Sequence, residues 1–275
     1  MAGRETGVVS DAALVRYEQV DEATARTASR RYWEDEASDY QREHGAFLGD
    51  VDFCWCPEGL RESQVRLLGD VAGRRVLEVG CGAAQCARWL AAHGAHVVGV
   101  DISAGQLAHG VELSRRTGIP VPLAQADAAA LPIASESVDL ACSAFGAVPF
   151  VADSGAVMRE VARVLRPGGR WVFSTNHPMI WCLPDEPDEA GMRVIQSYFD
   201  RRAYLERDGS GQPAYVETHR TMGDRVREIV AAGLTLLDVV EPEWPEDNHE
   251  VWGQWGPVRG HYLPSTAIFV TARPL

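Results

Sequence analysis

Residues 76–82 read Val-Leu-Glu-Val-Gly-Cys-Gly, an apolar run that breaks into a glycine turn and carries a glutamate near its end. Asp101 closes the next apolar run, 97–100, and lies 21 residues after Gly80. Glycine lets the backbone come close to a ligand, and a carboxylate after the neighbouring strand can accept hydrogen bonds from ribose hydroxyls. The stretch therefore predicts a nucleoside-bearing cofactor across the ends of two adjacent parallel strands.

The details of this turn discriminate between NAD and S-adenosylmethionine (SAM). A dinucleotide fingerprint reads Gly-x-Gly-x-x-Gly, but Gln85 stands at its third glycine position. Glu78 would repel a pyrophosphate, whereas it would attract an ammonium or a sulfonium group. The turn favours SAM as the cofactor, and an NAD-dependent oxidoreductase on the same fold is the alternative.

Composition limits the classes of protein to which the chain can belong. Its 275 residues are 46% hydrophobic, enough for one large α/β domain or two small ones. The net charge of −13 and the absence of a Lys/Arg run argue against a nucleic acid partner. The N-terminus lacks a secretion signal and no apolar run approaches 18 residues, so we expect no membrane partner and a cytoplasmic location.

The six cysteines do not follow the spacing of common metal or redox sites. None forms a Cys-x-x-Cys pair. Cys54 and Cys56 would share one face of a strand, but without a secretion signal a disulfide is the less favoured reading. We expect buried free thiols and no metal site.

The alternation of apolar patterns predicts a parallel sheet with helices on both faces. Five strands are expected before residue 178 and two after residue 233; the seven ranges are 75–80, 96–101, 120–127, 138–144, 170–176, 234–241 and 266–272. Helices are expected at 31–44, 58–68, 84–93, 104–116, 153–165 and 224–232. The chain should divide into an N-terminal arm and helical cap (1–70), a core (71–178), a substrate-lid insert (179–223) and the end of the same core (224–275).

Local signals mark some helix ends. Ser103 and Asp153 stand where each can cap the helix that follows. The second of these helices should stop at Pro167-Gly168-Gly169. Asp224, at the start of the late helix, is expected to cap it or to form an ion pair.

Five motifs, in order and at family spacing, resemble those of class I SAM-dependent methyltransferases. They are Val76–Gly82, Val98–Ser103, Gln125–Asp127 followed by Leu131-Pro132, Val138–Ser143 and Glu160–Gly169. The resemblance is close over 71–178 and loose over 217–275. It implies a doubly wound, seven-stranded, mostly parallel sheet with one antiparallel strand near the C-terminus.

The resemblance assigns five residues to the methionine part of SAM. Glu78 would hold the amino group, and the backbone at Gly80, Gly82 and Ala84 would lie under the methionyl and ribose portions. Ala84 departs from the glycine that is common there. Ser143, at the end of the fourth strand, would lie close to the methionine moiety.

Four further residues would hold the adenosine. Asp101 would accept hydrogen bonds from the ribose hydroxyls, and Ile102 would cover one adenine face. Asp127 would accept one from the adenine amino group, and the Ala128 N–H would reach a ring nitrogen. Helix caps and turns are the alternative roles for the two aspartates, and their places at strand ends favour the binding role.

Two residues are candidates for catalysis. His177 follows the fifth strand and would face the substrate, where a histidine can act as a base near neutral pH. A structural histidine before a proline turn is the equal alternative. Tyr40, on an N-terminal helix, would reach the methionine carboxylate or line the acceptor pocket, and packing on the core is its alternative.

Aromatic residues outside the motifs predict the character of the acceptor. The tryptophans that we expect to frame its pocket are Trp55, Trp181, Trp244, Trp252 and Trp255. Large rings suit a flat or apolar molecule and can shelter a positive charge. Four acids in 241–247 would suit an amine at one rim, although a solvated loop is the simpler reading. Tyr198, Tyr204, Glu217 and His219 could each orient an acceptor.

These observations predict a SAM-dependent methyltransferase. It would move a methyl group to an O, N or C atom of a small aromatic or apolar molecule and leave S-adenosylhomocysteine as product. A non-catalytic SAM-binding protein is a second alternative. Exposed aromatic residues would also fit a homodimer.

Overall fold

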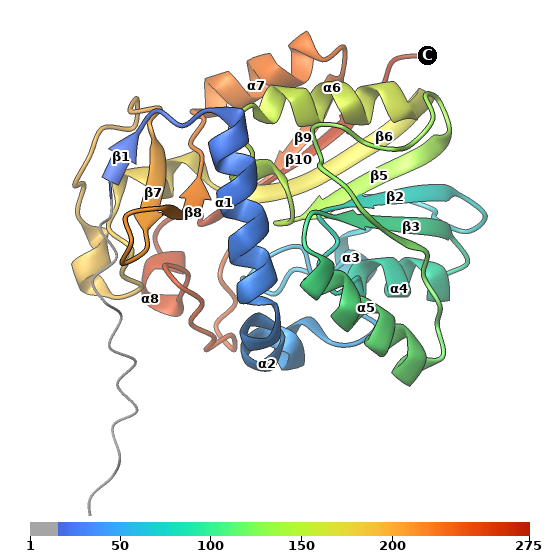
Figure 1. Ribbon diagram of the computed structural model, residues 1–275, viewed down its shortest axis with the longest axis horizontal. Helices are drawn as coiled ribbons and strands as arrows, with labels where there is room; N and C mark the ends of the chain where they lie inside the picture. The colour runs from blue at the N-terminus through green and yellow to red at the C-terminus, as the bar shows by residue number, and fades with distance from the viewer. Residues whose placement is uncertain (1–15) are drawn as a thin grey trace, which may run out of the picture.

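The computed structural model describes residues 16–275 and contains a seven-stranded sheet with the order β4-β3-β2-β5-β6-β10-β9 (Figure 1). Its strands are β2 (Arg75–Val79), β3 (His96–Asp101), β4 (Leu123–Gln125), β5 (Val138–Ala144), β6 (Leu165–Asn176), β9 (Thr235–Val240) and β10 (Thr266–Ala272). β10 is antiparallel to both β6 and β9, whereas the pairs among β2 to β6 are parallel. The predicted fold class, including the single antiparallel strand, is confirmed.

Helices cover both faces of this sheet (Figure 1). One layer holds α4 (Gln85–Ala92) and α5 (Ala104–Thr117), and the other holds α6 (Ser154–Val164) and α7 (Met222–Ala231). Successive residues of a strand point to opposite faces. Leu77 and Val79 of β2 therefore pack under α6, whereas Val76 packs under α4 and α5. The sheet therefore separates two apolar cores, one on each of its faces.

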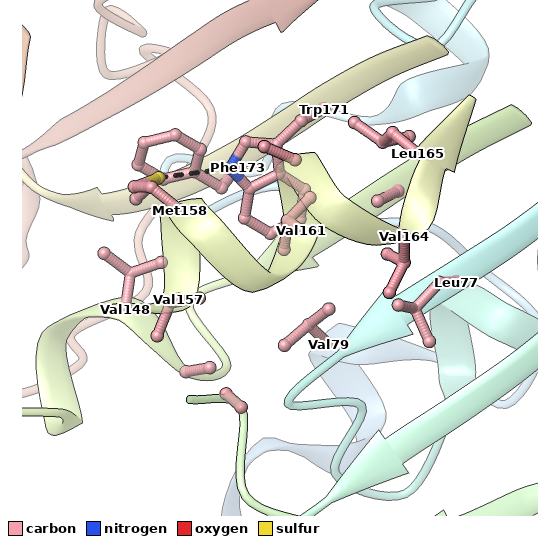
Figure 2. Close-up of a cluster of buried hydrophobic side chains, with 14 of the residues drawn as sticks. Leu77, Val79, Val148, Val157, Met158, Val161, Val164, Leu165, Trp171 and Phe173 are labelled. Atoms are coloured by element: carbon pink, nitrogen blue, oxygen red, sulfur yellow. Dashed lines mark hydrogen bonds between the residues drawn. The ribbon is translucent and has the colours of Figure 1, made fainter. Parts of the chain in front are cut away.

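The core beneath α6 explains why a helix forms within the predicted range 153–165. Val157, Met158 and Val161 are fully buried and face the sheet (Figure 2). The indole N–H of Trp171 donates to the Met158 sulfur at 3.4 Å. Burying apolar surface contributes about 25 cal/mol per Å². The packing of these apolar side chains against the sheet is therefore the main contribution to the stability of the helix.

Several predicted boundaries differ from the observed ones. The helix expected at 58–68 is only the single turn α3 (Glu62–Val65), because the Glu62 carboxylate accepts N–H bonds from Leu67 and Leu68 and holds an irregular loop. The expected strand 120–127 shortens to β4. Pro167-Gly168-Gly169 lies inside β6, since the Gly168 N–H donates to the Arg273 carbonyl.

Of the two predicted helix caps, one is confirmed. Ser103 Oγ accepts the Gln106 N–H at 3.1 Å. Asp153 precedes α6 but makes no capping bond, because its carboxylate pairs with Arg159 Nη2 at 2.8 Å. The prediction for Asp153 as a cap is therefore wrong.

The N-terminal region is more helical than the sequence predicts. It contains α1 (Glu22–Asp35) and α2 (Ala37–Leu48), so the single helix expected at 31–44 is in fact two helices that begin earlier and end later. Asp21 caps α1 by accepting the Thr24 N–H at 2.8 Å. The first fifteen residues of the predicted arm lie outside the described part of the chain.

A second sheet of three strands, which the sequence analysis did not predict, lies beside the main one (Figure 1). It is formed by β1 (Arg16–Glu18), β7 (Ala203–Arg207) and β8 (Pro213–Glu217). Leu205 and Val216 on one face pack against Ala25 and Ala28 of α1. The short helices of the remaining loops are η1 (Val148–Phe150), η2 (Pro178–Cys182), η3 (Glu189–Met192) and α8 (Pro257–Gly260).

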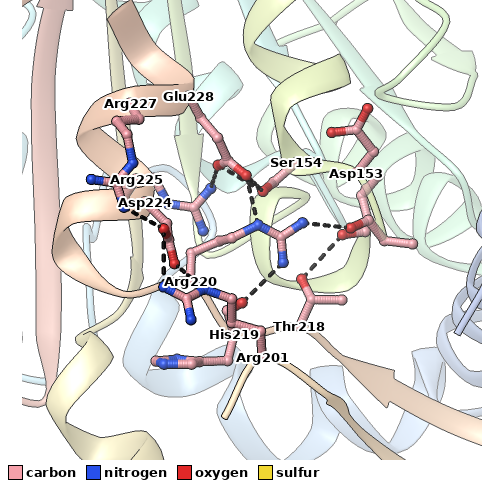
Figure 3. Close-up of polar contacts among 12 residues, drawn as sticks. Asp153, Ser154, Arg201, Thr218, His219, Arg220, Asp224, Arg225, Arg227 and Glu228 are labelled. Carbon is pink, nitrogen blue, oxygen red and sulfur yellow. Dashed lines mark hydrogen bonds and ion pairs between the residues drawn. The ribbon is translucent and has the colours of Figure 1, made fainter. Parts of the chain in front are cut away.

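An ionic network fixes the chain between β8 and α7 to α6 (Figure 3). Glu228 of α7 accepts bonds from Ser154 Oγ at 3.0 and 2.9 Å and from Arg220 Nε at 2.6 Å. Asp224 joins the capping box of α7 and pairs with Arg201 Nε at 2.6 Å. Asp224 both caps and pairs, as predicted.

Three further findings concern the described residues. All six cysteines are free and buried, as predicted. Among residues 16–275, no helix is long and apolar enough to cross a bilayer. The same part of the chain holds no group of three or more His, Cys, Asp or Glu side chains arranged to bind a metal ion.

Candidate active site

A first cavity of about 320 Å³ opens at the carboxyl ends of the parallel strands. Its wall includes the turn after β2, the end of β3, the segment after β4 and the end of β5. The order of the strands reverses between β2 and β5, and ligands of open α/β sheets bind at such a point. The cavity lies where the glycine turn and Asp101 predict a cofactor.

The turn after β2 is built from left-handed residues. Gly80, Gly82 and Ala84 have φ values of 67°, 51° and 59°. A Cβ atom on Gly80 would lie 2.4 Å from the carbonyl carbon of Gly146. Only glycine fits at position 80, because two backbone segments approach each other there at the edge of the first cavity.

Glu78 lines this cavity with a carboxylate that is poorly compensated. The residue is 3% exposed, and its Oε2 atom is buried with no hydrogen-bond partner among residues 16–275. Burial raises the pKa of Glu78 to about 8, although the Ala87 N–H and the Arg88 charge act in the opposite direction. A positively charged group in the cavity would stabilise the carboxylate form.

Asp101 joins the glycine turn to the start of α5. Its Oδ2 accepts the Gly82 N–H at 2.7 Å and its Oδ1 accepts the Ser103 N–H at 2.9 Å. A carboxylate has about four lone-pair sites, so two acceptor positions are left for ligand hydroxyls. Asp101 and the adjacent Ile102 both line the first cavity.

Asp127 and Ala128 also line the first cavity, after β4. Asp127 Oδ1 accepts the Ala129 N–H at 2.8 Å, and Oδ2 lies 3.5 Å from Arg26 Nη1 of α1. Asp127 therefore shapes its own turn and still faces the cavity. The structure brings it together with Asp101 and Glu78, as the sequence analysis expects.

Two residues expected at the methionine part of the cofactor do not line either large cavity. Ala84 is buried behind the turn and packs in the core under α4. Ser143 is buried too, and the next residues of the chain, Ala144 and Phe145, line the cavity in its place. Strand alternation explains the place of Ser143, because its neighbour Ala144 at the end of β5 points to the opposite face. Ala84 lies in the turn at the start of α4, outside any strand.

A second cavity of about 370 Å³ adjoins the first. Nearly half of the residues that line it are Phe, Tyr or Trp, and it extends from the end of β5 to the three-stranded sheet. The residues that line both cavities are Trp33, Tyr40, Leu48, Cys54, Ala144, Phe145 and Phe150. The two spaces therefore meet along a shared wall.

Tyr40 of α2 stands at this junction. Its ring lies edge-on to Trp33 at 5.5 Å and to Trp252 at 5.8 Å between ring centroids. Burial raises the pKa of the Tyr40 phenol above its usual range, so the side chain is neutral. Both expected roles remain compatible with this place, because Tyr40 packs on other rings and also faces both cavities.

His177 does not reach either large cavity, contrary to the catalytic expectation. It is 7% exposed and caps η2 by accepting the Met179 N–H on Nδ1 at 3.1 Å. Its Nε2 lies 2.8 Å from Glu241 Oε1. Burial lowers the pKa of His177, and the Glu241 carboxylate opposes that shift. Because both ring nitrogens are engaged, the geometry supports the structural alternative.

The aromatic expectation holds for four tryptophans. Trp55, Trp181, Trp252 and Trp255 line the second cavity. Trp244 does not, since it packs under α8 and donates to the Asn248 carbonyl at 2.8 Å.

The acids of 241–247 stay outside both cavities as well. Instead, Asp185, Glu206 and Glu217 supply the carboxylates of the second cavity. Of the four other candidates for orienting an acceptor, Tyr204 and Glu217 line this cavity, whereas Tyr198 and His219 do not.

Sequence reasoning missed a chain of glutamines over the glycine turn. Gln85 Nε2 donates to Gln41 Oε1, and Gln41 Nε2 donates to Gln106 Oε1, both at 3.0 Å. All three line the first cavity, and their hydrogen bonds connect α2 to α4 and α5. The sequence analysis uses Gln85 only as the residue at the third glycine position. No local sequence pattern indicates that Gln41 of α2 is its hydrogen-bond partner.

Comparison with known proteins gives a match to the central part of the chain. A family model described as "Methyltransferase domain" matches residues 76–169. "Methyltransferase GfsG" of Streptomyces halstedii is 41% identical over 116 residues, which cover 41% of each chain. A demethylmenaquinone methyltransferase of Corynebacterium kroppenstedtii is 33% identical over 131 residues, covering 48% of this chain and 52% of that one. The matches span about half the length of these relatives, or less.

A solved structure resembles a larger part of the chain. The SAM-dependent methyltransferase from Mesorhizobium loti superimposes with a TM-score of 0.63 at 26% sequence identity. The superposition covers 79% of this chain and 98% of the other. The similarity in three dimensions therefore extends beyond residues 76–169, which the family model matches.

Proposed function

We propose that this chain transfers a methyl group from SAM to an O, N or C atom of a small molecule, because residues 76–169 match a methyltransferase domain and the fold resembles that of a SAM-dependent methyltransferase. The observation that carries the proposal is the first cavity, in which Glu78, Asp101 and Asp127 meet beside the glycine turn. S-adenosylhomocysteine would be the second product.

The residues of the first cavity fit SAM. The unpartnered Glu78 Oε2 suits the amino group of the methionine part, and Asp101 has lone pairs free for ribose hydroxyls. Gly80 and Gly82 allow close approach of the ligand to the backbone. Asp127, Ile102 and the Ala128 N–H would contact the adenine. A pyrophosphate would disfavour the ionised form of the buried Glu78, whereas an ammonium group would favour it, and this difference argues against the NAD alternative.

The second cavity is the natural place for the methyl acceptor, since it shares a wall with the first. SAM supplies a methyl group that is already activated by its sulfonium, so the protein mainly orients the acceptor and excludes water. Correct orientation alone can contribute roughly 7–11 kcal/mol. We propose Tyr40 as a residue that positions the acceptor at the junction of the two cavities.

The parts of the chain outside the central core would serve this arrangement. Residues 1–70 and 179–223 would cover the cofactor and the acceptor, while 71–178 and 224–275 would form the core. The acceptor would be a small molecule rather than a nucleic acid, in keeping with the acidic net charge of the chain. A cytoplasmic location is supported by six unpaired thiols, which suit a reducing compartment.

A homodimer is the proposed assembly, because the insert exposes apolar residues. Val194, Ile195 and Phe199 are each at least half exposed. Light scattering on a gel-filtration column would give the mass directly. A mass near 60 kDa supports the dimer, and a mass near the 30.0 kDa of one chain contradicts it.

Ligand-dependent thermal stability tests the proposed cofactor. SAM or S-adenosylhomocysteine at 100 times its dissociation constant should stabilise the protein by about 2.7 kcal/mol, whereas NAD should have no effect. Asp101→Ala should lose this gain, and Asp247→Ala, an exposed control outside both cavities, should keep it. Stabilisation by NAD alone would overturn the proposal, and tight SAM binding without turnover of any acceptor would favour a non-catalytic binding protein.

A further inference from the structure

The far wall of the second cavity is one face of the three-stranded sheet. Tyr17, Tyr204 and Glu217 stand opposite one another across β1, β7 and β8, and Glu206 stands opposite Tyr215. Residues opposite each other, and residues two apart on a strand, share a face. All five therefore project to the cavity side, while Leu205 and Val216 hold the other face against α1.

Acids rather than basic side chains line the second cavity, although the charge of Arg259, which lies outside the lining, acts against the rise that burial causes in the pKa of Asp185. Asp185, Glu206 and Glu217 line this cavity, and none of the three has an ion-pair partner among residues 16–275. Within the same range, no Lys or Arg lines the cavity. Its one histidine, His44, is stacked on Trp252 at 3.7 Å, and burial lowers the pKa of that imidazole.

The surroundings disfavour the ionised form of Glu217 in the absence of a ligand. Burial raises the pKa of Glu217 to about 7, against a hydrogen bond from Asn176 Nδ2, and the charges of Asp185 and Glu206 act in the same direction as burial. Glu206 Oε1 accepts the Tyr204 hydroxyl at 2.6 Å. A cation bound beside such a carboxylate offsets the lost hydration and stabilises its ionised form.

Aromatic rings surround these carboxylates. Tyr17 lies edge-on to Trp181 and to Tyr204, each at 5.8 Å, and Tyr32 lies 4.7 Å from Tyr215. All of these rings line the second cavity. The faces of aromatic rings carry partial negative charge and attract cations. An aromatic wall with unpaired acids and no basic side chain selects for positive charge.

We propose that the methyl acceptor carries a cationic nitrogen, a protonated amine, that binds between Glu206 and Glu217 at the three-stranded sheet. The apolar body of the acceptor then extends along the aromatic wall toward Tyr40 and the first cavity. This inference rests on the proposed function, because it assigns the second cavity to the acceptor. It places the cation-binding groups inside the molecule, whereas the sequence suggested the acidic rim at 241–247.

Matched probes test the charge preference of the cavity. The protein is saturated with S-adenosylhomocysteine and titrated, by calorimetry, with small aromatic amines such as phenethylamine and tryptamine. Each amine is compared with the alcohol and the carboxylate of the same skeleton. At least one amine should bind about tenfold or more tightly than its alcohol, and the carboxylates should bind most weakly.

Isosteric variants locate the preference. In Glu206→Gln/Glu217→Gln the advantage of the amine should fall to less than threefold, while Glu243→Gln, exposed and outside both cavities, should retain it. Binding of S-adenosylhomocysteine should stay unchanged in both, which shows that the variants fold. A panel in which no amine exceeds its alcohol, or a double variant that keeps the preference, overturns the inference. Failure of the wild type to bind S-adenosylhomocysteine would instead count against the proposed function.

Discussion

At the scale of single residues, the first cavity concentrates groups that are unfavourable for stability. Glu78 is buried, and one of its carboxyl oxygens has no hydrogen-bond partner in the described part of the chain, residues 16–275. Gly80 and Ala84 adopt left-handed conformations. Strain and unpaired polar groups of this kind are characteristic of binding sites, where a ligand offsets their cost. Exchanging such residues should separate stability from ligand binding.

Replacing the buried Glu78 by glutamine should increase the stability of the protein, and the increase should depend on pH. The pKa of Glu78 in the folded protein, about 8, lies above the value of about 4.3 in an unfolded chain, so the wild-type protein loses stability as the pH rises between these values. Glu78→Gln cannot ionise and should be more stable than wild type by up to about 4 kcal/mol at pH 8. At pH 4.5 the two should be nearly equal. Urea unfolding of both proteins at both pH values measures this difference. A difference in unfolding free energy that is the same at pH 4.5 and pH 8 would contradict the raised pKa of Glu78.

The same variant should bind SAM more weakly, because its amide cannot pair with the ammonium group. Calorimetry in buffers of different ionisation enthalpy adds a second measurement. Wild-type protein at pH 7 should release a proton on binding SAM, since the cation lowers the pKa of Glu78. Glu78→Gln should release less.

Gly80 predicts a large steric effect. Gly80→Ala would place a methyl group 2.4 Å from Gly146 in a left-handed conformation, and should cost about 3 kcal/mol or more together with ligand binding. Gly118→Ala is the matched control, because Gly118 has a φ of 70° but open space around its Cβ position. It should cost only about 1 kcal/mol. Equal losses in the two variants, measured by urea unfolding, would show that the close approach at Gly80 is unimportant.

At the scale of elements, the short helix η2 is held in place by contacts of His177. His177 precedes and caps η2, and the first turn of η2 depends on the bond that the His177 ring accepts from the Met179 N–H. The bond from His177 to Glu241 ties this turn to the segment after β9. These contacts predict a stabilising role for the histidine and no role in the chemical step.

Two substitutions of His177 separate these roles. His177→Asn keeps an acceptor for the Met179 N–H and should lose about 1 kcal/mol, whereas His177→Ala should lose about 2 kcal/mol. Once an acceptor substrate is known, kcat should stay within a few-fold of wild type in both. A fall of about 10²–10⁴-fold, as expected for a general base, would restore the catalytic assignment.

At the scale of the whole molecule, the first cavity is completed by elements far apart in the sequence. α1 and α2 supply Arg26, Trp33, Tyr40 and Gln41 to a wall that otherwise consists of strand ends. In Figure 1, α1 lies between the small sheet and the main sheet. A ligand in the first cavity therefore contacts both the core and its N-terminal cover.

Hydrogen exchange should report this coupling. Saturation with S-adenosylhomocysteine should slow amide exchange in α1 and α2 by at least tenfold, because opening of these helices would expose the ligand. α7 lines neither large cavity and serves as the internal control. Equal protection of α7 and α2 would indicate a global effect, and unchanged exchange in α1 and α2 would remove them from the site.

The sequence by itself determined the main sheet and the position of the cofactor site. Apolar periodicity, the left-handed glycine turn and the acids at strand ends are short-range features, and their effect on the backbone depends little on the rest of the chain. For this reason the strand Thr266–Ala272 and the capping residue Ser103 were predicted correctly, as were Glu78, Asp101 and Asp127 as residues that come together.

Only the tertiary structure decided which side chains face the cavities. His177 and Ser143 stand at strand ends, as the sequence says, but the direction of each side chain depends on the register and twist of its strand. The acids of the second cavity depend on how the hairpin of β7 and β8, in which Glu206 stands opposite Tyr215, pairs with β1 near the other end of the chain. Such pairings are settled by packing across the whole molecule, and no local pattern records them.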